Sequence, residues 1–233
     1  MMLPVNPAPA IMKSFMVLYY TIWLWSDNKI YCNGQGNRQV GDKSMDKATI
    51  INHLIKSKKY KSYLEIGIQI RINWDQIDCD KKVGVEPFYI TGDKRIKKVI
   101  SDKFFASNKE KFDVIFIDGD HHEDAVYRDI KNSLLCLEDG GTIVLHDAFP
   151  PDLEHTQAYH CGTVYRAIWK ARLEGGLSVL TYSGDFGVCL MKKSDEPAIQ
   201  CAVGDYRNYM DNAELIINVK TSESSFMEAF ESW

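Results

Sequence analysis

Two apolar segments of the 233-residue chain each end in a group of ionisable side chains. The first segment, FDVIFI, runs into DGDHH at 118–122, and the second, TIVL, runs into His146 and Asp147. Carboxylates and imidazoles can take a proton from a substrate or bind a cation. In an open α/β sheet, ligands bind outside the carboxyl ends of the strands. Two neighbouring strands that end in this way would therefore bring these groups to one crevice.

These residue types allow two kinds of chemistry. His146 or His121 could act as a general base that removes the proton of a hydroxyl nucleophile. Alternatively, Asp118, His146 and Asp147 could hold Mg²⁺ or another divalent cation, which would lower the pKa of a bound hydroxyl. Oxygen ligands suit Mg²⁺, whereas an imidazole among them is unusual. The sequence leaves both mechanisms open, together with a purely structural role in hydrogen-bonding the loops.

Acidic residues also occur in the two preceding strands. The first predicted strand, 62–67, contains Glu65, which is costly to bury unless it is paired. It ends at Gly67, where the missing side chain would let a ligand approach the backbone. The second predicted strand, 82–86, ends at Glu86, a position from which an acid binds ribose hydroxyls in dinucleotide folds. Together they predict a cofactor that contains ribose.

Ser101 and Asp102 precede two consecutive phenylalanines. The acid and the rings could bind the edge and the face of an adenine. The alternative is that Ser101 or Asp102 caps a helix whose phenylalanines belong to the core.

Strands alternate with helices along residues 45–193, which predicts a parallel sheet covered on both faces. Strands 177–181 and 188–191 are joined by a short connection, which favours an antiparallel hairpin at the edge of the sheet. Gly140 and Gly141 are expected to end the helix that precedes the TIVL strand. A first helix is predicted at 45–58, because isoleucines and leucine recur there at helical spacing, and Asp46 could cap it.

The two ends of the chain lie outside this pattern. Residues 1–44 form an N-terminal extension, whose apolar stretch 11–25 is too short to span a bilayer comfortably. We consider a hairpin or an oligomer contact, a membrane-associated segment and an unstructured leader. Residues 194–233 form a C-terminal tail, in which 222–233 is expected to be a short helix that packs on the domain.

Composition narrows the functional classes. The net charge of −4 gives no support to nucleic-acid binding, which requires a basic surface. The six cysteines include no CxxC pair and no metal-like spacing. This pattern predicts a reducing compartment without disulfides, so we expect a cytoplasmic protein.

The motifs together resemble the class I S-adenosylmethionine (SAM)-dependent methyltransferases. More narrowly, they resemble a bacterial branch that pairs an IDGxH-type strand end with a downstream LHDxxPP. Five segments match in order, over roughly residues 45–193. These are YKSYLEIGIQ, NWDQIDCDKKVGVEP, ISDKFF, FDVIFIDGDHH and GGTIVLHDAFPP.

The resemblance implies a Rossmann-like, seven-stranded α/β sheet and methyl transfer from SAM to a hydroxyl of a small molecule or sugar. The implied partner is a small-molecule acceptor, and the oligomeric state is left open. The loop from Asp118 to His122 would close over the sulfonium and border the acceptor. The residues expected to bind SAM are Glu65, Gly67, Ile68, Gln69, Glu86, Pro87, Ser101, Asp102, Asp118 and Gly119.

At one position the sequence departs from the family, which usually carries a further glycine near Arg71. The arginine side chain could crowd the carboxylate of the cofactor, or its guanidinium could bind that carboxylate. Two rival functions therefore stay open. One is a cofactor-binding protein of this fold without turnover. The other is a different nucleotide-dependent enzyme, against which the missing GxGxxG argues.

Overall fold

The computed structural model describes residues 45–88 and 92–233, so the predictions for residues 1–44 lie outside it. The strands of the described residues are β1 (Ser62–Ile66), β2 (Lys81–Val85), β3 (Ile96–Lys97), β4 (Phe112–Ile117), β5 (Leu137–Leu145), β6 (Leu177–Tyr182), β7 (Val188–Lys193) and β8 (Val219–Lys220). Their helices are α2 (Lys47–Lys58), α3 (Ile72–Gln76), α4 (Ser101–Ser107), α5 (Glu123–Cys136), the 3-10 turn η1 (Glu154–Thr156), α6 (Val164–Arg172), α7 (Tyr206–Asp211), α8 (Ala213–Ile217) and α9 (Glu223–Glu231).

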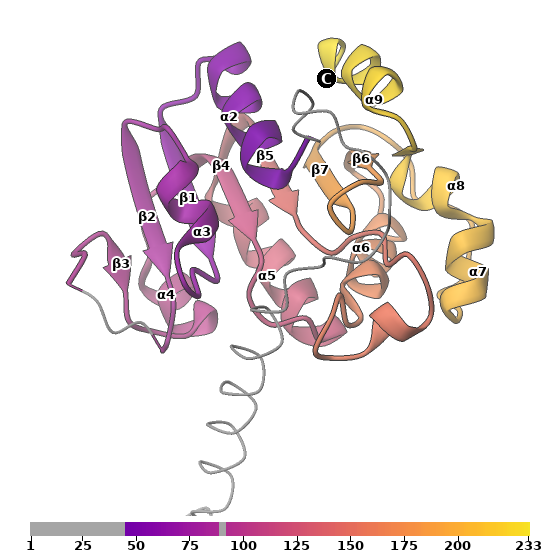
Figure 1. The fold of residues 1–233 in the computed structure, drawn as a ribbon, viewed down its shortest axis with the longest axis horizontal. Helices are drawn as coiled ribbons and strands as arrows, with labels where there is room; N and C mark the ends of the chain where they lie inside the picture. Colours follow the sequence, from indigo (N-terminus) through magenta and orange to yellow (C-terminus); the bar gives the residue numbers. More distant parts are fainter. Residues whose placement is uncertain (1–44, 89–91) are drawn as a thin grey trace, which may run out of the picture. The chain divides into compact units, whose positions relative to one another are not determined.

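Across these residues the strands form one eight-stranded sheet in the order β3-β2-β1-β4-β5-β7-β6-β8 (Figure 1). The strands from β3 to β5 pair in parallel, and β7 runs antiparallel between β5 and β6. The predicted α/β class, with a mostly parallel sheet and one antiparallel hairpin, is confirmed. The short strand β8 pairs in parallel with β6 and lies outside the hairpin.

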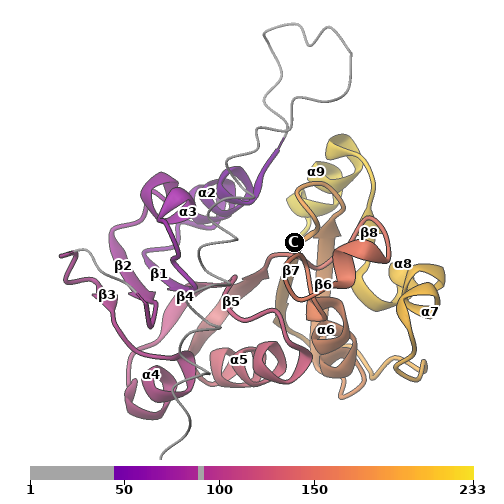
Figure 2. The same ribbon diagram turned by 60° about the horizontal axis from the view of Figure 1, so that its bottom comes forward.

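Helices cover both faces of the sheet (Figure 2). On one face lie α2, α3 and α9, and on the other lie the helices from α4 to α8. Side chains alternate between the two faces along each strand. Phe116 and Val144 therefore pack in the core under α2, whereas Ile115 and Leu145 pack in the core under α5 and α6.

Helix α2 confirms the predicted first helix and its cap. Asp46 accepts a hydrogen bond from the backbone N–H of Thr49 at 2.9 Å, which satisfies one of the unpaired amides at the helix start. The helix ends at Lys59, whose backbone is left-handed. Its apolar face is buried against the sheet through Ala48, Ile50, Ile51, Leu54 and Ile55.

The prediction that Gly140 and Gly141 end a helix is wrong. Helix α5 ends earlier, and β5 starts at the next residue without a glycine between them. The glycines lie inside β5, where its pairing with β4 shifts between Phe112 and Val114. A side chain at Gly141 would lie 2.8 Å from the carbonyl oxygen of Asp113. The glycines thus serve an irregular strand that approaches its neighbour closely.

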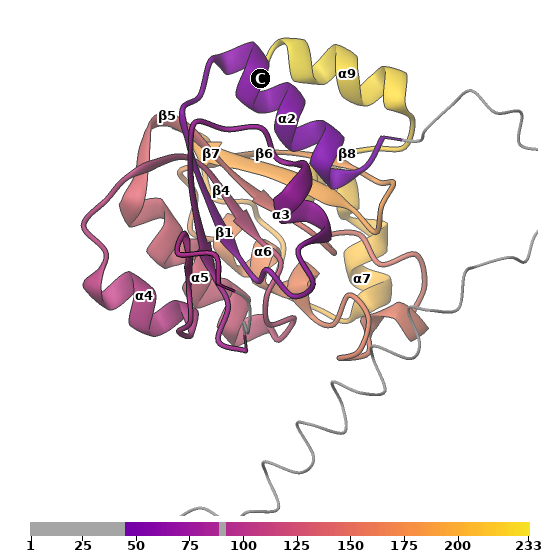
Figure 3. The same ribbon diagram turned by 60° about the vertical axis from the view of Figure 1, so that its left-hand side comes forward.

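Helices α9 and α2 lie side by side on the same face (Figure 3). The ring of Phe230 is 5.0 Å from that of His53 on α2, and the ring of Phe226 is 5.6 Å from that of Tyr182 on β6. The contacts of α9 thus extend the core beyond α2. No helix within residues 45–88 and 92–233 combines the length and the apolarity needed to cross a membrane.

We expect Phe226→Ala to lower the free energy of unfolding by about 3–5 kcal/mol, because it leaves a cavity in a buried core. Phe226 is fully buried, so we expect the surrounding side chains to fill the cavity only in part. Denaturant unfolding measures this change. The control Glu228→Ala, on the exposed side of α9, should change the free energy by less than about 0.5 kcal/mol. Equal stability of the two variants would contradict this packing.

Candidate active site

The candidate site lies where the chain reverses its direction across the sheet. The chain passes outward from β1 to β2 and β3 and then returns to β4, on the other side of β1. Gly67 follows β1 with a φ of +91°, and a Cβ there would lie 2.2 Å from the carbonyl oxygen of Asp118. Its N–H donates to Val85 O at 3.0 Å, while the N–H of Asp118 donates to Ile66 O at 2.9 Å. Only glycine fits this approach of the two strand ends.

Glu86, at the end of β2, holds the turn that follows Gly67. The residue is 5% exposed. It accepts hydrogen bonds from the backbone N–H of Gln69 at 3.1 Å and of Phe88 at 2.9 Å. Within the described residues these bonds use two of the roughly four acceptor positions of a carboxylate, which leaves room for a diol. Ile68 is buried in the same turn, and Pro87 follows in the next.

Ser101 and Asp102 are the first two residues of α4. The predicted cap role is wrong, because the residue before the helix is Ile100 and no side chain caps it. The core role of the following aromatics holds for Phe104, which is buried. The Asp102 carboxylate is half exposed and 3.5 Å from Arg128 Nε. Contact of Ser101 and Asp102 with an adenine stays a prediction.

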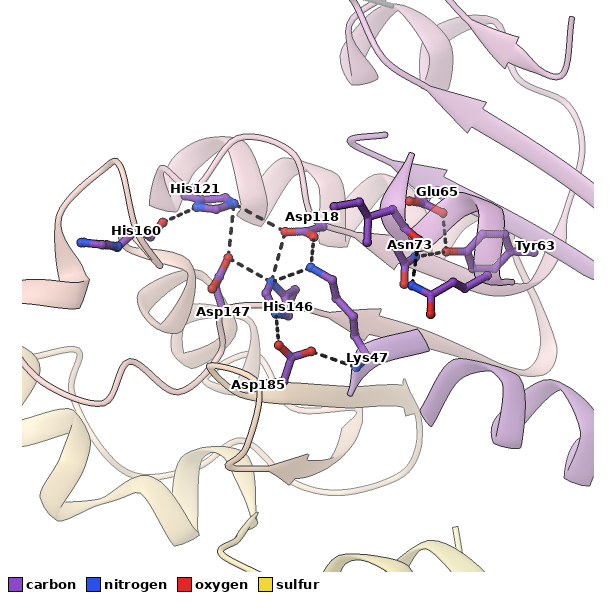
Figure 4. A network of polar contacts seen from close by, with 12 residues as sticks. Lys47, Tyr63, Glu65, Asn73, Asp118, His121, His146, Asp147, His160 and Asp185 are labelled. Carbon is purple, nitrogen blue, oxygen red and sulfur yellow. Dashed lines mark hydrogen bonds and ion pairs between the residues drawn. The ribbon is translucent and has the colours of Figure 1, made fainter. Parts of the chain in front are cut away.

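Asp118 and His146 follow the neighbouring strands β4 and β5, and their side chains point to the face of the sheet that α2 covers. Both lie two residues beyond side chains that face this helix, Phe116 and Val144, so alternation turns them the same way. The first residue of α2, Lys47, completes the group (Figure 4). Its Nζ is 2.8 Å from Asp118 Oδ2 and 3.4 Å from His146 Nδ1.

Two further carboxylates surround His146. Its Nδ1 is 3.3 Å from Asp118 Oδ1 and 3.2 Å from Asp147 Oδ2, and its Nε2 is 3.5 Å from Asp185 Oδ1. Asp185 also accepts a hydrogen bond from the backbone N–H of Lys47 at 2.9 Å. Three loops and the start of α2 thus meet on one imidazole.

Sequence reasoning missed Lys47 and Asp185. A signal for Lys47 was present, since a cation in the first turn of a helix opposes the helix dipole unless an acid compensates it. No comparable signal marked Asp185, which lies in the short β6–β7 connection.

His121 reaches the same centre from the loop after β4. Its Nδ1 hydrogen-bonds to the carbonyl oxygen of His160. A carbonyl can only accept, so Nδ1 carries a proton and Nε2 is the nitrogen left for chemistry. His121 Nε2 lies 3.4 Å from Asp147 Oδ2 and 3.6 Å from Asp118 Oδ1. The backbone N–H of Thr163 donates to His121 O at 2.8 Å and helps to fix this loop.

Among the described residues, Asp118, His121 and Asp147 could hold a metal ion. Their ligand atoms lie within 4.8 Å of one another. His121 Nε2 is buried and makes no hydrogen bond within this part of the chain, although two carboxylates lie within ion-pair distance of it. These residue types can bind a small divalent cation, and His121 takes the place that the sequence predicted for His146.

The charges in this centre stabilise one another. Burial would raise the pKa of Asp118 and of Asp147, but Lys47 and His146 outweigh it for the first and His146 and His121 for the second, so both pKa values are lowered. Burial would lower the pKa of both imidazoles, but the same carboxylates raise the pKa of His121 to about 9 and that of His146 well above its usual value. At neutral pH the acids are therefore ionised and the imidazoles protonated.

The β6–β7 connection is a strained turn. Gly187 N–H donates to Gly184 O at 3.0 Å, and the residues between them, Asp185 and Phe186, have φ values of +50° and +58°. This is the type I′ turn that suits hairpins, but glycine or asparagine usually occupies its centre. A phenylalanine with positive φ is an outlier, and such strain is concentrated at functional sites.

Phe186 belongs to a row of rings beside the charged centre. It is 44% exposed and stacks on His155 at 5.7 Å between ring centroids. His155 in turn lies 4.7 Å from His160, and His160 lies 4.7 Å from Tyr159. The row extends from the β6–β7 turn to the residue whose carbonyl holds His121.

Glu65 lies in a buried network on the face of β1 that α2 covers. Tyr63 Oη donates to Glu65 Oε2 at 2.7 Å, and Asn73 Nδ2 donates to Tyr63 Oη at 3.1 Å. Glu65 is 1% exposed, and this burial raises its pKa to about 8 although the hydrogen bonds oppose it. The carboxyl group is therefore mostly protonated at neutral pH.

Arg71 takes the backbone conformation that a glycine would favour. Its φ is +70°, and that of Gln69 is +47°. Its guanidinium forms an ion pair with Asp75 at 2.6 Å and lies 3.6 Å from Asp93. The chain thus makes a left-handed turn at Arg71 without a glycine, and the guanidinium points toward two acids.

One family model matches part of the chain. A family model described as "Methyltransferase domain" matches residues 76–148, a segment that contains Glu86, Asp118, His121 and Asp147. No curated protein matches the chain.

Several solved structures are similar to this one at low sequence identity. The methyltransferase PaMTH1 of Podospora anserina, with bound S-adenosylhomocysteine (SAH), is 15% identical over 83% of this chain and 100% of that one, with a TM-score of 0.48. An O-methyltransferase of Bacillus cereus, in complex with SAH, is 13% identical over 82% and 93%, with a TM-score of 0.44. The O-methyltransferase TomG of Streptomyces achromogenes, in complex with SAM, is 13% identical over 76% and 98%, with a TM-score of 0.46.

The protonated state of Glu65 predicts a pH-dependent stability. The folded carboxyl keeps its proton up to about pH 8, whereas the unfolded one releases it near 4.5. Between these values the unfolded state binds fewer protons, so stability falls as the pH rises, by up to about 1.4 kcal/mol per pH unit. Glutamine does not ionise, so Glu65→Gln removes this pH-dependent loss of folding stability.

Urea unfolding of both proteins between about pH 5 and 8 tests this, since contributions of all other groups cancel in the difference. We expect Glu65→Gln to gain stability over the wild type as the pH rises. The exposed control Glu228→Gln should run parallel to the wild type. Parallel curves for Glu65→Gln would show that Glu65 is ionised in the folded protein.

Proposed function

We propose that the protein is a SAM-dependent methyltransferase that methylates a hydroxyl group of a small molecule or sugar. One observation carries this proposal: the ends of β1, β2, β4 and β5 bring Gly67, Glu86, Asp118 and His146-Asp147 to one edge of the sheet. This is the edge where open α/β sheets bind ligands. The match of residues 76–148 to a methyltransferase domain supports it.

The residues at this edge fit the cofactor. Gly67 brings the ends of β1 and β4 together at the proposed methionine end, and Glu86 offers acceptor positions for the ribose diol. Further contacts are proposed from the order of the residues along the edge: Glu65, Ile68 and Gln69 at the methionine end, Pro87 at the ribose, Ser101 and Asp102 at the adenine, and Asp118 and Gly119 at the sulfonium.

When bound, SAM supplies an electrophilic methyl group. An acceptor hydroxyl that attacked this methyl group would have to lose its proton. His121 is placed to take the proton at Nε2, because its Nδ1 is committed to His160 O. Asp147 Oδ2 lies 3.4 Å from the same Nε2 and would stabilise the imidazolium that forms. The raised pKa of His121 makes it a strong base, but only the minor neutral form can act at pH 7.

The row of rings gives the acceptor a surface beside this base. Phe186, His155 and His160 present flat side chains next to the loop that holds His121. The faces of aromatic rings and the apolar faces of sugars both pack on such side chains. The rest of the reaction is positioning, since acceptor oxygen, methyl carbon and sulfur must lie in line.

Binding without turnover remains the rival, and Arg71 is the residue on which it depends. Its ion pairs with Asp75 and Asp93 favour a structural role for the guanidinium over crowding of the cofactor.

Calorimetry with SAM, SAH, NAD and NADP tests the cofactor. We expect SAM and SAH to bind with a stoichiometry of one per chain and the nicotinamide nucleotides not to bind. Binding of neither SAM nor SAH would reject the proposal, and binding of both without methyl transfer to any acceptor tried would favour the rival.

We expect Glu86→Ala to weaken SAH binding by about 10- to 100-fold, because hydrogen bonds to a charged carboxylate contribute about 1.5–3 kcal/mol. The exposed Asp80→Ala serves as control. Glu86 also holds backbone amides, so the 2′-deoxy analogue of SAH separates the two roles. This analogue should bind the wild type more weakly than SAH does, and the variant should not distinguish them. Equal discrimination by both proteins would place the ribose elsewhere.

We expect Asp147→Ala to lower kcat by at least about 100-fold, because it removes a carboxylate that would stabilise the protonated form of the proposed base. Affinity for SAM should stay within about threefold, since Asp147 is proposed on the acceptor side of the site. Formation of SAH with a panel of phenols, sugars and alcohols measures turnover. The exposed Asp139→Ala should behave as the wild type does. Persistent activity in Asp147→Ala would move the acceptor chemistry away from this centre.

A further inference from the structure

Lys47 contacts the acidic centre through both its side chain and its backbone. Its Nζ lies 2.8 Å from Asp118 Oδ2, and its backbone N–H donates to Asp185 Oδ2 at 2.9 Å. The side chain is 24% exposed and passes over the ring of Phe116, 6.0 Å from the ring centre. A cation is unfavourable at the start of a helix, so this lysine is retained against the dipole of α2 by the acids that it meets.

The ammonium and a divalent cation would compete for the same carboxylate. Asp118 gives Oδ2 to Lys47, while its Oδ1 faces His121 Nε2 at 3.6 Å. A metal ion on Asp118, His121 and Asp147 would use that Oδ1 and would lie only a few ångströms from a permanent positive charge. Repulsion between such charges is strong where water is partly excluded.

We propose that the Lys47 ammonium is a resident cation of this centre, beside the imidazoles of His121 and His146, and that it keeps divalent metal ions off Asp118, His121 and Asp147. Lys47 is thus a positioning residue. It holds Asp118 in place and supplies the positive charge that a metal ion would otherwise provide. This inference does not depend on methyl transfer, because it concerns the affinity of the chain for a metal ion alone.

Calorimetric titration of the full chain with Mn²⁺ tests the proposal. We expect Lys47→Met, which keeps the length of the side chain and removes its charge, to bind Mn²⁺ at least about tenfold more tightly than the wild type. Lys56→Met, on the exposed side of the same helix, should bind as the wild type does. Equal affinity of Lys47→Met and the wild type would overturn the proposal.

Two further variants locate the ion and isolate the charge. Adding Asp147→Asn to Lys47→Met should abolish the gained affinity, and failure to do so would place the ion elsewhere and overturn the proposal. Lys47→Arg keeps a cation and should retain the weak binding of the wild type, whereas Mn²⁺ binding as tight as in Lys47→Met would show that charge is not the cause.

The wild-type chain gives an independent test should Lys47→Met fail to fold, which thermal unfolding would reveal. Micromolar binding of Mn²⁺ by the wild type, lost in Asp147→Asn, would overturn the proposal. Weak Mn²⁺ binding by a wild type that binds SAH would support it and leave the proposed function intact, while loss of SAH binding alone would affect only the proposed function.

Discussion

The close approach of β1 and β4 at Gly67 determines the rest of the site. The two strands are neighbours in the sheet but are separated in the chain by β2 and β3, so their ends meet where the chain reverses. At this point the backbone of Asp118 lies against Gly67 so closely that no side chain fits. The hydrogen bonds of Gly67 and Asp118 to the adjacent strands set the register of the strand ends, and so the relative positions of Glu86 and Asp118. A site for a ligand follows from a constraint on the backbone.

The charged centre follows from the alternation of side chains. Asp118 and His146 point to the face covered by α2 because each continues the register of its strand. Burying several acids and imidazoles is costly unless opposite charges compensate each other. The structure meets this cost by drawing ionisable groups from four separate segments onto one another. Through Lys47, the resulting network fixes the start of α2 to the carboxylates of Asp118 and Asp185.

Much of this arrangement could be predicted from the sequence, because the long strands carry continuous apolar runs and their ends carry the acids. The two-residue strands β3 and β8 are too short for any periodic signal. Gly140 and Gly141 were misassigned because α5 passes directly into β5, so that no glycine is needed to stop the helix. Asp185 could not be placed, and the cation at the start of α2 did not reveal which acids Lys47 meets, because both roles arise from the crossing of distant segments. A contact over 138 residues, such as that between them, leaves no local pattern.

The type I′ turn of the hairpin accepts an unfavourable backbone conformation, and its two central side chains make contacts with distant segments. A sequence such as Asn-Gly at positions 185 and 186 would relax the two left-handed residues and make the hairpin easier to form. It would also remove the carboxylate that grips the first amide of α2 and the ring that stacks on His155. The unfavourable turn thus ties three distant parts of the chain together, and a more relaxed hairpin would fold well and disconnect them.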